Sequence, residues 1–230
     1  MLRDWETLPD FMRIAEVRPY YDALNQKKTS LALKRIFDFV TAVFLLIIFA
    51  IPMVVIAILI KCDSEGPVFY RQERVTTYGK HFCIHKFRTM VNNADKIGTT
   101  VTVSGDARIT KVGQKLRDLR LDELPQVFDV LEGNMSFVGT RPEAVKYVEK
   151  YKPEYFATLL LPAGITSEAA IRYKDEAKLL DAAADVDRTY VEQILPEKMK
   201  WNLQSIIKFS FFDDVATMFR TVLAVLGKNY

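Results

Sequence analysis

The stretch LDELPQVFDVLEGNMSFVGTR, residues 121–141, begins with two adjacent acids, Asp122 and Glu123. Apolar residues then recur at helical spacing, which predicts a helix that starts at the acids and ends at Gly133. Pro125 is compatible with this helix because proline is tolerated in a first turn. Free backbone N–H groups and the helix dipole favour negative charge at that end. We therefore expect the acids to stay ionised, with Asp122 serving either as a helix cap or as a carboxylate nucleophile.

The composition is that of one domain with a sizeable core. Half of the 230 residues are hydrophobic, and they include 15 Phe and 10 Tyr. The net charge is only +3, from 32 basic and 29 acidic residues, and no basic stripe with interleaved aromatic residues occurs. The sequence therefore argues against a nucleic-acid partner. Two cysteines give no disulfide framework, which favours a reducing, cytosolic setting.

An apolar run from Val40 to Ile60 is interrupted only by Thr41 and Pro52. About 20 apolar residues suffice to cross a bilayer, so we expect a membrane helix over residues 31–61. Pro52 predicts a kink, and neither half of the helix is long enough to cross by itself. Basic residues flank the run equally, whereas a spanning helix has a positive excess on its cytoplasmic side. We therefore expect a bent, re-entrant helix with both ends in the cytosol, and we expect Asp38 near its start to anchor it by pairing with Lys34 or Arg35.

The remaining segments predict an α+β protein that is mostly helical, with one small β-hairpin. Residues 68–75 and 80–90 are rich in β-branched and aromatic residues and are separated by a turn at 77–79. Further helices are expected at 109–119, 186–208 and 213–226, and one opening at Arg141-Pro142. The last helix has an apolar stripe that could pack on the core or lie on lipid.

Several basic residues are expected near the acids. Lys86 and Arg88 lie two apart in the second strand of the hairpin, so they should share a face that suits a diphosphate. The helix at 109–119 carries Arg117 and other cations towards Asp122. An anionic substrate beside an acid is the combination that phosphoryl-transfer sites use.

The chain resembles the bacterial monotopic phosphoglycosyl transferases, the polyprenyl-phosphate sugar-1-phosphate transferases, in their compact form. The segments that carry the resemblance occur in the family's order and are KRIFDF, GPVFYRQERV, HKFRTM, LDELPQVFDVLEGNMSFVGTRPE and GIT, within residues 31–170. We expect the chain to have three parts: an N-terminal surface segment (1–30), the re-entrant membrane helix (31–61) and a cytosolic catalytic domain with C-terminal helices (62–230).

The resemblance also implies a reaction. Asp122 would attack the sugar-linked phosphate of a UDP-sugar, UMP would leave, and the covalent phosphosugar would pass to undecaprenyl phosphate. Glu123 would help to hold Mg²⁺. The residues implied to contact phosphate are Lys86, Arg88, Arg117 and Arg141.

The resemblance places the protein at the bacterial inner membrane, with its catalytic domain on the cytosolic face, and is compatible with a homodimer. The reaction would be the first membrane step in assembling a glycan such as a capsule, O-antigen, exopolysaccharide or glycoprotein.

The sequence departs from the family at Ile51, at Thr140 and after GIT, and it does not identify the sugar. Two alternatives remain: a non-catalytic membrane-anchored binder of lipid phosphate, which would not need Asp122, and a membrane phosphodiesterase, which would use water as the acceptor.

Overall fold

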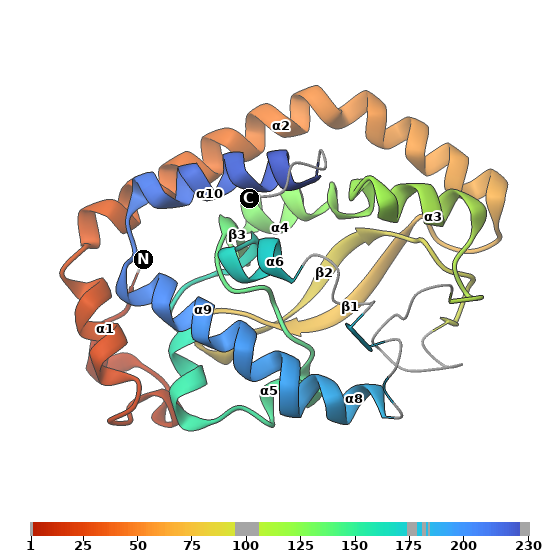
Figure 1. Ribbon diagram of the computed structural model, residues 1–230. Helices are drawn as coiled ribbons and strands as arrows, with labels where there is room; N and C mark the ends of the chain where they lie inside the picture. The colour runs from red at the N-terminus through yellow and green to blue at the C-terminus, as the bar shows by residue number, and fades with distance from the viewer. Residues whose placement is uncertain (1, 95–105, 174–178, 181–182, 184, 226–230) are drawn as a thin grey trace.

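The computed structural model describes residues 2–94, 106–173, 179–180, 183 and 185–225 (Figure 1). Helices make up most of this part of the chain, and its strands form two small sheets, which confirms the expected α+β class. The helices are α1 (Arg18–Asn25), α2 (Lys28–Asp63), α3 (Lys111–Asp118), α4 (Gln126–Glu132), α5 (Val145–Val148), α6 (Glu168–Arg172), α8 (Val186–Thr189), α9 (Leu195–Ile207) and α10 (Phe211–Val225). The strands are β1 (Phe69–Val75), β2 (His81–Phe87), β3 (Met135–Val138) and β4 (Ala163–Thr166).

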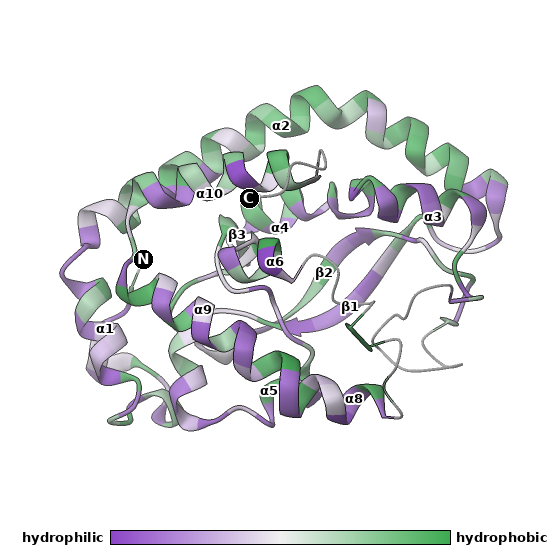
Figure 2. Cartoon of the chain, viewed as in Figure 1, coloured by the Kyte–Doolittle hydropathy of each residue, from purple (hydrophilic) through white to green (hydrophobic). Residues whose placement is uncertain are grey.

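Helix α2 forms an arch along one side of the molecule (Figure 1). It continues through Pro52, so the kink expected there does not break the helix. Its outer surface is apolar along most of its length (Figure 2), and Ile47 and Ile51 are 72% and 77% exposed. By length and hydropathy α2 can cross a membrane, and its central part is mostly exposed.

Polar residues near the start of α2 attach it to the rest of the protein. Lys34 binds the carboxylate of Asp214 in α10, with 2.6 Å between Nζ and Oδ2. Asp38 accepts a hydrogen bond of 2.7 Å from Ser136 in β3, and Arg35 donates to carbonyl oxygens at the end of α4. Asp38 therefore anchors the helix, but through β3 instead of the expected pairing with Lys34 or Arg35.

The expected β-hairpin is confirmed. Strands β1 and β2 are antiparallel, with Tyr70 opposite Lys86 and Arg71 opposite His85. Directly opposed residues share a face of the sheet, and side chains alternate along each strand. Tyr70, Gln72 and Arg74 therefore lie on the same face as Lys86.

The GIT segment forms β4, which pairs in parallel with β3. Strand β4 also approaches the backbone just beyond the end of β3 very closely: Gly164 donates a 2.8 Å hydrogen bond to the carbonyl of Thr140. A Cβ atom on Gly164 would lie 2.2 Å from backbone atoms of Gly139. Only glycine fits at this position, and the contact fixes the turn that leads to Arg141.

The N-terminal segment, expected to be a surface segment over residues 1–30, contributes side chains to a hydrophobic core. Met12, Val17 and Leu24 are completely buried, and they belong to the same hydrophobic core as α9. Helix α1 packs directly on α9. The apolar residues of this segment therefore pack against a helix that lies far away in the sequence.

The helix that follows the acid pair begins later than expected. Asp122 and Glu123 lie on a 3₁₀ turn (Leu121–Glu123), and α4 starts at Gln126. Pro125 has no N–H with which to continue the preceding turn as an α-helix, and neither acid caps α4. Gly133 ends α4 in the left-handed region, with φ of 83°, as expected.

The segment after β3 also differs from the expectation. Arg141-Pro142 belongs to no helix or strand, and the next helix, α5, starts at Val145. The polar loop expected at 92–106 lies mostly outside the described residues.

Candidate active site

The acid pair lies between α3 and α4, on a short turn that connects the two helices. Arg120, directly before the pair, has φ of 57°, a left-handed conformation that is unusual for a residue other than glycine. Such strain persists only where surrounding contacts enforce it, and it is common at functional sites. The short turn then presents Asp122 and Glu123 towards the β1–β2 hairpin.

Glu123 is held by two cations. Its Oε1 lies 3.0 Å from Nζ of Lys86, and the guanidinium group of Arg141 donates to both of its oxygens. Burial alone would raise the pKa of Glu123, but the charges of Arg141 and Lys86 outweigh this effect and hold the pKa well below its ordinary value. Glu123 is therefore an anion in the resting site.

Asp122 is in a different environment. Its carboxylate accepts no hydrogen bond from the described residues. Burial raises the pKa of Asp122, the negative charge of Glu123 raises it further, and Lys86, Arg117 and Arg141 oppose the increase. The expectation that a helix terminus keeps Asp122 ionised is wrong, because the residue is not at the start of α4. Its anionic form depends on neighbouring cations.

The structure brings three of the four expected phosphate-binding residues to the acids. Lys86 and Arg141 contact Glu123, and Arg117 lies close enough to Asp122 to affect its pKa. Arg88 is elsewhere: its Nη2 donates to the carbonyl of Ser64, at 2.7 Å, at the end of α2. Strand β2 ends at Phe87, so the alternation that places Lys86 in the site does not extend to Arg88.

Arg74 is a further cation of the site that the sequence analysis did not identify. It shares a sheet face with Lys86, and its Nη1 donates to the carbonyl of Pro142, at 3.2 Å, directly after Arg141. Burial lowers the pKa of Arg74, Glu143 opposes this, and Arg141 lowers it further. The sequence YRQERV (70–75) contained the information needed to find Arg74. Side chains alternate along a strand, so Tyr70, Gln72 and Arg74 lie on one face.

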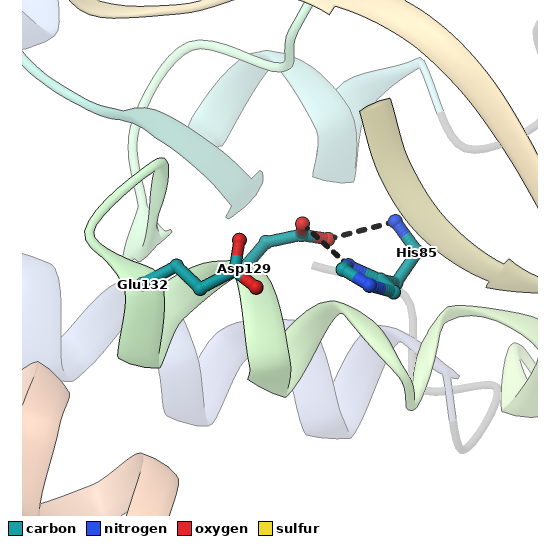
Figure 3. Close-up of side chains that lie close together, drawn as sticks. All are labelled: His85, Asp129 and Glu132. Carbon is teal, nitrogen blue, oxygen red and sulfur yellow. Dashed lines mark hydrogen bonds and ion pairs between the residues drawn. The ribbon is translucent and has the colours of Figure 1, made fainter. Parts of the chain in front are cut away.

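His85, Asp129 and Glu132 form a cluster next to this site (Figure 3). Asp129 is completely buried, and it accepts hydrogen bonds from the backbone N–H of His85, at 2.9 Å, and from its ring Nδ1, at 2.8 Å. Burial raises the pKa of Asp129, and these hydrogen bonds oppose the increase. The residue types would suit a metal, but here each oxygen of Asp129 accepts a hydrogen bond from His85, and the exposed Glu132 accepts one from Asn134. We therefore interpret the contact as a bracket that holds β2 on α4, next to Lys86.

Glu123 has room for one further interaction. A carboxylate offers about four lone-pair sites, and Lys86 and Arg141 use three of them. Mg²⁺ takes oxygen ligands and commonly binds one or two carboxylates together with substrate phosphates. The donor atoms of the acid pair thus fit a magnesium ion.

The fold and the site define a protein with a membrane-type helix and an acid pair surrounded by cations, an arrangement suited to phosphoryl chemistry. The family described as bacterial sugar transferase matches residues 29–228. The chain belongs to this family.

Three relatives illustrate the similarity. Over 197 residues the chain is 36% identical to the UDP-N-acetylgalactosamine-undecaprenyl-phosphate N-acetylgalactosaminephosphotransferase of Aeromonas hydrophila, a match that covers 84% of this chain and 44% of the relative. Over 211 residues it is 36% identical to the UDP-glucose:undecaprenyl-phosphate glucose-1-phosphate transferase of Escherichia coli, covering 90% and 42%. The protein of the same name from Caulobacter vibrioides is 33% identical over 196 residues, covering 84% and 69%. The chain thus spans less than half the length of the first two relatives.

Proposed function

We propose that the protein transfers a sugar-1-phosphate from a UDP-sugar to undecaprenyl phosphate and releases UMP. The observation that carries the proposal is the carboxylate of Asp122, which accepts no hydrogen bond from the described part of the chain. It lies beside the ion-paired Glu123 and close enough to Lys86, Arg117 and Arg141 for their charges to lower its pKa. The relatives named for reactions of this type support it. Their names differ in the sugar, so we leave the sugar unassigned.

The reaction proceeds in two displacements at phosphorus. An Asp122 oxygen forms a bond to the sugar-linked phosphorus, and the bond from that phosphorus to the UMP oxygen breaks. An oxygen of the lipid phosphate then attacks the same phosphorus, and the bond to Asp122 breaks and restores the carboxylate. A covalent route of this kind lets two anionic substrates of different solubility use one site in turn.

The cations of the site bind the diphosphate and favour the anionic form of Asp122. Lys86, Arg117 and Arg141 all act in this direction on the pKa of Asp122. Glu123 would hold Mg²⁺ together with substrate phosphate, and the ion would neutralise charge on the diphosphate. Arg88 acts at the end of α2 and has no role in binding phosphate in this proposal.

The acceptor requires a site at the membrane. We propose that α2 enters the cytosolic leaflet of the inner membrane and returns, so that the acid pair lies at the depth of the lipid phosphate. Both ends of α2 contact the same domain, through Lys34 and Asp214 at one end and through Asp63, which accepts from the backbone of Val112, at the other. These contacts support a helix whose ends lie on one side of the bilayer.

The test compares Asp122→Asn with Asp118→Asn, which makes the same change on the exposed surface of α3. We expect Asp122→Asn to reduce UMP release at least about 10³-fold, because a carboxamide is a poor nucleophile, and Asp118→Asn to leave it unchanged. The assay uses a panel of UDP-sugars with undecaprenyl phosphate in vesicles.

Three outcomes contradict the proposal. Normal turnover by Asp122→Asn removes this residue from the nucleophile role. Sustained turnover without undecaprenyl phosphate indicates a phosphodiesterase instead. Mass spectrometry of the wild-type protein with its donor alone should show phosphosugar on Asp122, and an adduct on another residue would also contradict the covalent route.

A further inference from the structure

A buried cluster lies next to the segment that carries Arg141. Glu143 comes two residues later and is only 6% exposed, and its Oε1 accepts a hydrogen bond of 2.6 Å from the hydroxyl of Tyr190. Lys198 completes the cluster: its Nζ donates to the same hydroxyl, at 3.0 Å, and lies 3.7 Å from Oε1 of Glu143. A buried charge is costly unless it is paired and hydrogen-bonded. The three side chains, which we call the Glu143 cluster, therefore depend on one another.

The partners of the buried carboxylate come from the C-terminal helices. A π-helix (Tyr190–Ile194) joins α8 to α9 and holds Tyr190 at its first position, and Lys198 follows in α9 (Figure 1). Pro196, near the start of α9, lacks the N–H that an α-helix would bond to the carbonyl of residue 192, and the wider π turn lies directly before α9. Such turns are rare and occur frequently at functional sites. The ring of Tyr190 packs on that of Tyr147, with 4.7 Å between their centroids, and this contact fixes its hydroxyl at the carboxylate.

Strand β1 holds the backbone of the segment that follows Arg141. The N–H of Val75 donates to the carbonyl of Glu143, at 3.1 Å. Nη1 of Arg74 donates to the carbonyl of Pro142, at 3.2 Å, and the proline ring fixes the φ angle of that residue. The short link from Arg141 to Glu143 therefore has little freedom, and a shift of Glu143 moves Arg141 as well.

The Glu143 cluster is too deeply buried to touch a substrate. Tyr190 is 3% exposed, and Glu143 and Lys198 are 6% exposed each. Burial lowers the pKa of Arg74, and the negative charge of Glu143 opposes this effect. The cluster therefore acts on the acid pair through the residues next to it, and of these Arg141 contacts the acid pair directly.

We propose that the Glu143 cluster positions Arg141, so that its guanidinium group stays against Glu123 and can bind the diphosphate of the donor. The inference rests on the proposed function, which assigns that diphosphate to this site. It makes Tyr190 and Lys198 positioning residues, which act on donor binding without contacting the donor. The C-terminal helices thereby contribute to donor binding through the core of the protein.

Binding of UDP in the presence of Mg²⁺ tests the inference, because UDP carries the diphosphate of the donor and its binding needs no turnover. Tyr190→Phe removes only the hydroxyl that binds Glu143, and we expect it to raise the Kd for UDP about fivefold or more. Tyr147→Phe is the matched control, since it removes the hydroxyl of the neighbouring ring, which binds Asp187 instead. We expect this control to change the Kd by less than about twofold. Calorimetric titration of the full chain in detergent measures both values.

Lys198→Met provides a second variant if Tyr190→Phe folds poorly. Methionine keeps the unbranched, apolar part of the lysine side chain and removes the ammonium group. We expect a similar rise in the Kd for UDP, because Glu143 loses its cationic partner. Its control is Lys200→Met, at an exposed position of the same helix where the lysine pairs with Glu197, and this change should leave the Kd unchanged.

An Arg141→Ala background separates positioning from a general loss of stability. If the cluster acts through Arg141, Tyr190→Phe should raise the Kd in this background by less than about twofold. An equal rise in both backgrounds, or a lower melting temperature with an unchanged Kd, overturns the inference and leaves the proposed function in place. A wild-type protein that does not bind UDP contradicts the UDP-sugar donor of the proposed function, and the inference falls with it.

Discussion

At the residue scale, two adjacent carboxylates have opposite environments. Arg141 and Lys86 keep the pKa of Glu123 low, whereas burial and the charge of Glu123 raise the pKa of Asp122. Environments that push the pKa values of neighbouring acids apart commonly divide their roles. Here Glu123 is suited to a fixed, charged position and Asp122 to a reactive one.

The metal requirement tests the role of Glu123. We expect EDTA to abolish UMP release by the wild-type protein and added Mg²⁺ to restore it. Glu123→Gln should need about tenfold more Mg²⁺ for half-maximal activity, because it loses a charged oxygen ligand. Titration of Mg²⁺ against initial rate measures this difference, and full activity in EDTA would rule out Glu123 as a metal ligand.

The bracket between Asp129 and His85 gives a second prediction at this scale. We expect Asp129→Asn to reduce UMP release about tenfold, because it breaks one of two partly buried hydrogen bonds to His85 and lets Lys86 move away from Glu123. The same change in a Lys86→Ala background should have little effect, since the residue it positions is gone.

The exposed neighbour Glu132 is the matched control for that bracket. Glu132→Gln should leave the rate within about twofold, because its carboxylate contacts Asn134 and not His85. A loss equal to that of Asp129→Asn would instead favour a metal site in this cluster. Additive effects of Asp129→Asn and Lys86→Ala would show that Asp129 does not act through Lys86.

At the element scale, short segments position the site. The β1–β2 hairpin carries Lys86 and Arg74, the turn before α4 carries the acids, and the irregular segment between β3 and α5 carries Arg141. These pieces are connected by close backbone contacts and by the bracket at Asp129. Small changes in their packing should therefore affect activity.

The approach of β4 to the end of β3 provides a prediction. Gly164→Ala places a Cβ 2.2 Å from backbone atoms of Gly139, so the strands must separate. We expect a loss of about 2 kcal/mol or more in stability, together with a lower affinity for the donor because Arg141 follows this contact. Thermal unfolding in detergent and the KM for the UDP-sugar measure the two effects. A variant with unchanged melting temperature and KM would show that the contact can relax without cost.

At the scale of the whole molecule, α2 and the domain beneath it form one unit. Lys34 and Asp38 attach one end of the helix to α10 and β3, and Asp63 attaches the other end to the start of α3. A helix held by one domain at both ends is difficult to place straight across a bilayer, because its ends would then lie on opposite sides.

Thiol labelling tests this topology. Gln26→Cys and Glu65→Cys place single thiols at exposed positions just outside the two ends of α2, in a chain with Cys62 and Cys83 replaced by serine. We expect both thiols to resist a membrane-impermeant maleimide in intact cells and to react after permeabilisation. Labelling of only one of them in intact cells would mean that α2 spans the membrane.

Local patterns in the sequence were sufficient to predict the apolar helix, the β-hairpin, the acid pair and the glycine that ends α4. Each of these features is determined by residues that are close together in the sequence. The relevant properties are hydrophobic periodicity, β-branched composition and the backbone freedom of glycine. The same patterns could not predict that Arg88 turns to Ser64, that Arg74 joins Arg141, or that the N-terminal segment enters the core. Nor could they decide whether the apolar stripe of α10 packs on the core or is exposed, as it is in this structure. Those results depend on packing between segments far apart in the chain, where burial, ion pairs and close backbone approach select one arrangement among many that the local sequence allows.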